Sequence, residues 1–187
     1  MKSIKVSLEV AVTMLLLVSA TMLADTRQTK AAVTTAPAVE ETALSRQVRH
    51  QLVTLPWYSV FDNLEYSIEG DTVALSGMVY RPTMKAAAEG AVKGVAGVSK
   101  VINNIEVLPL SPNDDRIRLA VYRVLFSALG LDRYALSAVP SIHIVVKNGH
   151  VTLTGVVDRQ TDGWSAEIFA KSVSGVFSVA NELRVRA

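Results

Sequence analysis

The sequence of 187 residues contains no cysteine. This absence excludes disulfide bonds, thiolate catalysis and cysteine-ligated metal sites. It also excludes lipid attachment at an N-terminal cysteine. The lack of cysteine does not by itself indicate a redox compartment.

Net charge is also small. The chain has 19 Lys and Arg against 17 Asp and Glu, which gives a formal net charge of +2 at pH 7. Domains that bind nucleic acid usually carry a concentrated basic surface. The balance of charges therefore argues against nucleic acid as a partner.

Signatures of catalysis and metal binding are missing as well. The sequence has no Gly-x-Ser-x-Gly elbow, no P-loop and no dinucleotide-binding glycine pattern. Its three histidines are His50, His143 and His150. Strand geometry puts the last two about 13 Å apart, too far to chelate one ion. We predict no catalytic residue, no metal site and no cofactor, and we do not expect an enzyme.

The chain lacks an apolar run of the length of a comfortable membrane span, about 20 residues. Val10–Val18 is apolar, follows the basic Met1–Lys5 and precedes the small residues of Ser19–Ala24. This order is typical of a secretory signal peptide. We predict that residues 1–24 are cleaved on export to the periplasm; the alternative is an uncleaved N-terminal membrane tether. Residues 25–41, rich in Thr, Ala and Val, predict a flexible tether.

One segment of 35 residues occurs twice. Residues 73–107 and 151–185 align without a gap and share 15 identities. Both contain Val-x-Leu-x-Gly-x-Val, a helical segment, and then Gly-Val-x-x-Val-x-Asn-x-Ile/Leu-x-Val. The duplication predicts two tandem domains of roughly 65 residues each, a size at which a core is thin. We place them at residues 42–108 and 111–187.

Hydrophobic spacing predicts the same order of elements in each domain: helix, strand, strand, helix, strand. Gly70-Asp71 fits a type II′ hairpin turn, and Asn148-Gly149 is the strongest short hairpin signal. A helix joins the last two strands, so these should be parallel with a right-handed crossover. The expected fold class is α+β: two tandem αββαβ domains, each a three-stranded mixed sheet with two helices on one face.

Two residue types recur within the predicted strands. Asn103 and Asn181 fall on the apolar side of the closing strands, where a buried amide must be hydrogen-bonded. We expect both to be structural ties. Gly77 and Gly155 lie in mid-strand, which indicates close approach of another backbone or of a helix.

Trp57, Tyr58 and Phe61 form an aromatic cluster after the first predicted helix. A thin domain needs large side chains to close its core, so we interpret the cluster as a lid over that core. The alternative is an anchor for a membrane interface or a partner, because Trp and Tyr combine apolar bodies with polar tips.

The repeated pattern resembles the BON domain over residues 42–108 and 113–185. The resemblance implies the αββαβ fold and a non-enzymatic role in the bacterial envelope. A signal peptide followed by two such domains is similar to osmotically inducible periplasmic proteins. Phospholipid association is proposed for several members of the family. In one related two-domain lipoprotein the lipid contact lies on the first helix of the second domain, which corresponds here to residues 113–128.

Two functions follow as expectations. The first is association with an anionic phospholipid surface in support of envelope integrity or stress tolerance. Its candidate residues are Arg116, Arg118, Arg123 and Tyr122. For these arginines an ordinary solvated helix face is the alternative.

The second function is a protein-interaction or chaperone-like role with envelope proteins. It would use the sheet face away from the helices, which is too apolar to be freely solvated. Its candidate residues are Met78, Ile102, Val145 and Val156. The same face could instead dock the two domains on each other. The oligomeric state is not indicated.

Overall fold

The first half of the chain forms the predicted order of elements in the computed structural model. Residues 42–137 and 139–186 are described, and they belong to one compact unit, Glu40–Ala187. The predicted signal peptide and tether lie outside the described residues. The elements of the first half are α1 (Ala43–Val53), β1 (Asn63–Glu69), β2 (Thr72–Val79), α2 (Pro82–Lys93), β3 (Lys100–Asn103) and β4 (Glu106–Val107). We refer to residues 42–108 as the first repeat.

The second repeat, residues 111–186, follows the same order with one addition. A short 3-10 helix, η1, separates its first helix from its first strand. The elements are α3 (Pro112–Ser127), η1 (Asp132–Ala135), β5 (Ile142–Lys147), β6 (His150–Val157), α4 (Gln160–Lys171) and β7 (Ser178–Val185).

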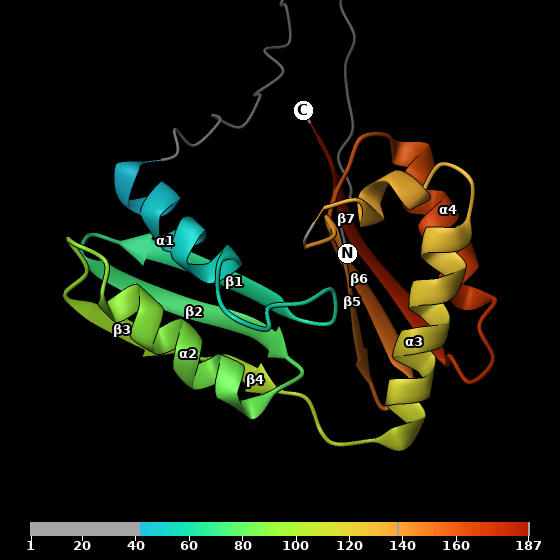
Figure 1. Cartoon of the computed structure of the whole chain (residues 1–187), viewed down its shortest axis with the longest axis horizontal. Helices are drawn as coiled ribbons and strands as arrows, with labels where there is room; N and C mark the ends of the chain where they lie inside the picture. The colour runs from blue at the N-terminus through green and yellow to red at the C-terminus, as the bar shows by residue number, and fades with distance from the viewer. Residues whose placement is uncertain (1–41, 138, 187) are drawn as a thin grey trace, which may run out of the picture. The chain divides into compact units, whose positions relative to one another are not determined.

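Each repeat builds one mixed sheet around its middle strand. In the first repeat β2 pairs antiparallel with β1 and parallel with β3 and β4. In the second, β6 pairs antiparallel with β5 and parallel with β7. Within each repeat both helices cover the same face of the sheet (Figure 1). The α+β class and the tandem αββαβ topology are therefore confirmed.

The closing strand of the first repeat differs from the single strand that we predicted. It is divided into β3 and β4, whereas β7 is continuous. The ladder nevertheless spans the break, because the amide of Asn104 donates to Leu75 O (2.8 Å) and that of Leu108 to Val79 O (2.9 Å).

The turns and mid-strand glycines have the predicted geometry. Gly70 alone has positive φ (62°) in its turn, as type II′ requires, while Asn148 (54°) and Gly149 (78°) both have it. Gly77 and Gly155 have φ of 102° and 118°. A Cβ on Gly77 would lie 2.2 Å from Asn63 O, and one on Gly155 would lie 2.0 Å from Ser141 O. The close backbone approach at both glycines is thus confirmed.

Asn103 and Asn181 tie the closing strands to the second helix of each repeat. Nδ2 of Asn103 donates to Lys85 O (2.9 Å), and Nδ2 of Asn181 donates to Gly163 O (2.9 Å). Each Nδ2 also donates to a helix carboxylate, Glu89 or Glu167. Each Oδ1 accepts the backbone amide two residues later, at 3.2 Å. The predicted structural role of both asparagines is confirmed.

Each repeat has its own apolar core between sheet and helices. The first is built mainly from Val48, Leu52, Val73, Leu75, Val79, Met84, Ala88, Val92 and Ile105. The second is built mainly from Ile117, Val121, Leu125, Ile142, Ile144, Val146, Val151, Leu153, Val157, Ala166 and Ala170. Val60, which precedes β1, also belongs to the second core. No helix among the described residues is both long and apolar enough to cross a membrane.

Candidate functional site

Helix α3 carries the predicted lipid-contact residues. It starts as the sequence indicates: Ser111 Oγ accepts the amide of Asp114 (3.2 Å), and Pro112 occupies the first turn. With one side of the helix packed in the core, the opposite side exposes Arg116, Leu119 and Arg123. These three positions are three and four residues apart, so they line one stripe of the helix. We call them the outer stripe of α3.

Asp114 at the start of α3 is buried and holds the β5–β6 hairpin. Its two carboxylate oxygens accept the amides of Asn148 (2.9 Å) and Gly149 (2.8 Å). The sequence explains an acid at this helix start by the helix dipole. It gives no signal that the acid reaches a turn 34 residues away.

Arg118 cannot serve as the predicted lipid contact, because its side chain is only 2% exposed. Its Nη2 donates to Val146 O, and its Nη1 pairs with Asp115. The guanidinium also lies over the ring of Tyr80, with 5.0 Å from Cζ to the ring centroid. The spacing of the apolar residues of α3 puts Arg118 at the edge of the buried stripe, and these partners draw its side chain inward. Arg118 is a structural residue in this fold.

Tyr122 lies beside the outer stripe but is half-buried. Its ring makes edge contacts with Phe61 (centroids 6.1 Å apart) and Phe126 (4.9 Å). Edge-to-face pairs of this kind stabilise packing. Of the four predicted lipid-contact residues, the structure therefore leaves Arg116 and Arg123 exposed together.

The predicted partner face is uneven in exposure. Ile102 on β3 is 39% exposed, whereas Val145 on β5 is only 2% exposed. Met78 and Val156 are half-buried. Val145 is therefore not a residue that a partner could reach in this conformation.

The segment Trp57–Asp62 of the first repeat packs on β5 of the second. The amide of Ile144 donates to Val60 O (2.7 Å). The rings of Tyr58 and His143 lie 5.5 Å apart. The lid interpretation holds for one of the three aromatic residues only: Tyr58 packs against the core of the first repeat. Phe61 and Val60 pack with the core of the second repeat instead, and Trp57 is exposed. The apolar sheet face gave a hint of such docking, but no sequence signal named this segment.

A cleft of about 1010 Å³ lies beside this contact, with Tyr58, Arg49, His143, Thr154 and Arg184 among its lining residues. Burial raises the pKa of Tyr58 to about 12 and lowers the pKa of His143. His143 therefore favours the neutral imidazole. Among the described residues, no group of three or more His, Cys, Asp or Glu side chains could hold a metal ion.

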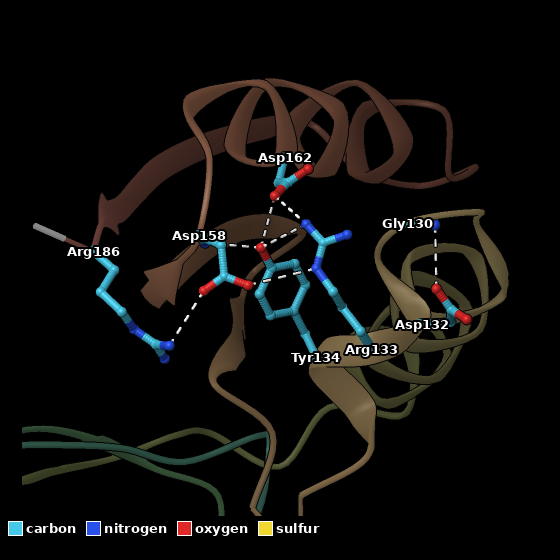
Figure 2. Close-up of polar contacts among 7 residues, drawn as sticks. All are labelled: Gly130, Asp132, Arg133, Tyr134, Asp158, Asp162 and Arg186. Atoms are coloured by element: carbon cyan, nitrogen blue, oxygen red, sulfur yellow. Dashed lines mark hydrogen bonds and ion pairs between the residues drawn. The ribbon is translucent and has the colours of Figure 1, made fainter.

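A polar cluster joins η1 to the start of α4 (Figure 2). The hydroxyl of Tyr134 accepts the amide of Asp158 (2.8 Å) and donates to Asp162 Oδ2 (2.7 Å). Arg133 pairs with Asp162 and with Asp158, and Arg186 pairs with Asp158 as well. Because these groups bind one another, we interpret the cluster as a brace of the fold.

These observations define a class: a tandem of two αββαβ modules with duplicated internal ties and an exposed cationic stripe on the second module. The BON domain matches this chain twice, at residues 40–109 and 113–187. The chain belongs to the BON domain family, as the repeated motif indicated.

A curated relative and two solved structures were also found. The chain is 30% identical over 152 residues to Osmotically-inducible protein Y of Escherichia coli (strain K12), which covers 79% of this chain and 74% of that protein. Two structures of CdsD, a structural protein of the type III secretion system of Chlamydia trachomatis, are each 12% identical and cover 78% of this chain. They cover 98% and 93% of their own chains, with TM-scores of 0.28 and 0.31. TM-scores this low support no inference about fold or function.

Proposed function

We propose that this protein is an exported, non-enzymatic envelope protein that associates with anionic phospholipid surfaces and supports stress tolerance. Membership of the BON family and similarity to an osmotically inducible protein support the envelope and stress parts of this proposal. The predicted signal peptide supports periplasmic location.

The observation that carries the lipid part is the outer stripe of α3. Among the described contacts, Arg116 bonds a neutral side chain, Asn113 Oδ1 (2.8 Å), and pairs with no described acidic residue. Arg123 is exposed about two helical turns further along. Guanidinium groups suit phosphate because they offer several donors in a fixed plane. Two such groups with Leu119 between them form a surface that fits an anionic, amphipathic partner.

Flotation with lipid vesicles tests the proposal. The exported protein should float with vesicles of phosphatidylglycerol and phosphatidylcholine and stay unbound with phosphatidylcholine alone. Arg116→Gln with Arg123→Gln should weaken binding by about 2 kcal/mol, roughly 30-fold, since each cation near an anionic surface contributes about 1 kcal/mol. High salt should also weaken the binding of the wild-type protein to the anionic vesicles.

A matched variant tests whether vesicle binding depends on the outer stripe of α3 or only on the net charge of the protein. Arg46 and Lys100 are exposed cations of the first repeat. Arg46→Gln with Lys100→Gln removes the same charge and should leave flotation nearly unchanged. If both double variants lose flotation equally, the binding depends on net charge and not on the outer stripe. If the wild-type protein binds neither type of vesicle, the proposal is wrong.

A second candidate function is interaction with envelope proteins through the outer face of the first sheet. It is favoured by Ile102, which is exposed there, with Met78 half-buried on the same face. Replacing both by Ser should abolish capture of a partner while leaving the circular dichroism spectrum unchanged. Undiminished capture by the folded variant would count against it.

A further inference from the structure

Helix α4 exposes two large apolar side chains on one side. Trp164 is 57% exposed and Ile168 is 67% exposed. They are four residues apart, so they lie above one another on the same helix face. The aligned positions of α2 in the first repeat are Ala86 and Gly90, which are also exposed but present almost no apolar surface. The apolar pair is thus a property of the second repeat alone.

Helices α3 and α4 of the second repeat are neighbours. A Cβ on Gly175, just past the end of α4, would lie 3.1 Å from Nη2 of Arg116 near the start of α3. Arg133, just past the end of α3, pairs with Asp162 in the first turn of α4. The two helices therefore run antiparallel, and both cover the same face of the sheet (Figure 1). Their solvent-facing sides consequently form one continuous surface.

This joint surface has the composition of a membrane-interface site. Trp prefers the headgroup region because its ring is apolar and its N–H is polar. Ile168 supplies apolar area of the kind that enters the boundary of the acyl chains. Arg116 and Arg123 form no ion pair with a described acidic residue, so their charge is available to lipid phosphates. On α4, Lys171 is exposed but pairs with Glu167 (2.6 Å).

The chain's other tryptophan is less suited to this role. Trp57 is 73% exposed, but the guanidinium of Arg81 lies over its ring, 5.2 Å from the centroid. One face of that indole is therefore already occupied by a cation. Trp57 also belongs to the first repeat and not to α3 or α4.

We propose that the outer α3–α4 surface of the second repeat is the part of the protein that seats in an anionic membrane. Trp164 and Ile168 enter the headgroup–acyl boundary, while Arg116 and Arg123 contact lipid phosphates. The inference rests on the proposed lipid association. It adds an apolar anchor on a second helix and an orientation of the protein on the membrane.

The two tryptophans allow a direct test. Trp57→Phe leaves Trp164 as the only indole, and Trp164→Phe leaves Trp57. With vesicles of phosphatidylglycerol and phosphatidylcholine, Trp164 emission should shift to the blue and be quenched by brominated acyl chains. Trp57 emission should change little. Quenching of Trp57 alone, or of neither indole while flotation persists, would overturn the anchor and leave the proposed lipid association standing.

Affinity provides a second measurement. Trp164→Ala with Ile168→Ala should weaken binding by at least about tenfold, because binding scales with buried apolar area. The residual binding should depend on salt as steeply as that of the wild type, since the arginines remain. Val53→Ser is the control, because Val53 is an exposed apolar residue of α1 outside this surface, and the variant should bind as the wild type does. Unchanged affinity of the double variant would overturn the anchor; absence of wild-type binding would overturn the proposed function and the anchor together.

Discussion

The two repeats satisfy the same backbone requirement with different side chains. The amides of Tyr80 and Asp158 occupy equivalent positions after the second strand. In the first repeat the acceptor is Asp62 Oδ1 (2.8 Å), and in the second it is the hydroxyl of Tyr134 (2.8 Å). The fold demands an acceptor for this amide but does not fix which residue supplies it. A duplicated fold can therefore vary its loops while its hydrogen-bond plan stays the same.

The repeats differ more in what they present to solvent. α2 exposes Ala86 and Gly90 where α4 exposes Trp164 and Ile168. By contrast, Asn103 and Asn181 make equivalent internal ties, each with Nδ2 donating to a helix backbone oxygen at 2.9 Å. The comparison separates residues that hold the fold from residues that give the second repeat its own surface.

The largest effect should come from a methyl group at the mid-strand glycines. Gly77→Ala and Gly155→Ala should each destabilise the protein by at least about 3 kcal/mol, because the new Cβ combines positive φ with a backbone clash. Gly70→Ala, at positive φ but with open space, should cost only about 1 kcal/mol. Urea denaturation measures all three. Equal losses at Gly70 and Gly155 would show that φ alone matters.

Removing the acceptor of the amide that follows the second strand should destabilise the protein more in the first repeat than in the second. Asp62→Ala removes a buried carboxylate that also accepts from Ser59 N (3.0 Å) and Ser59 Oγ (2.7 Å), so we expect a loss of about 3 kcal/mol. Tyr134→Phe removes one hydroxyl and should cost about 1 to 2 kcal/mol. Thermal or urea unfolding measures which of the two variants loses more stability. A larger loss for Tyr134→Phe would contradict it.

The two asparagine ties should be energetically equivalent. Asn103→Ala and Asn181→Ala should each cost about 2 kcal/mol, because each removes the same set of hydrogen bonds. Hydrogen exchange of the β3 and β7 amides reports the two repeats separately. A difference above about 1 kcal/mol between the two variants would show that the repeats share geometry but not energetics.

The smallest effect should be an acid-side loss of stability that arises at His143. Burial lowers the pKa of His143 in the folded state, so the unfolded chain binds the proton more readily. The free energy of unfolding should decrease as pH falls below the unfolded pKa, about 6.5, toward the lower folded pKa. His143→Gln should flatten this decrease. An unchanged slope in His143→Gln would rule out this source.

Much of the architecture was predictable because it depends on short patterns. The helix start at Ser111-Pro112 and the hairpin turn at Asn148-Gly149 each rest on the preferences of a few adjacent residues. The parallel pairing of the last two strands follows from the crossover helix. The break between β3 and β4 was not predicted, because the closing segment alternates like one strand.

The candidate site was predicted only in part. Arg116 and Arg123, two of the four predicted lipid-contact residues, lie on the solvent side of α3. Arg118 was misplaced because a long side chain can reach Val146 O and Tyr80, which lie far away in the sequence. Trp164 and Ile168 were not predicted as site residues, because their exposure depends on how α4 lies on its sheet.

The sequence by itself determined the duplication, the αββαβ order and the internal ties, because each is encoded in spacing that one repeat can satisfy within itself. Only the tertiary structure decided that Arg118 is buried, that Val60 completes the second core, and that α3 and α4 share one outer surface. These features depend on contacts between distant segments, and local periodicity carries no information about which distant partner a side chain meets.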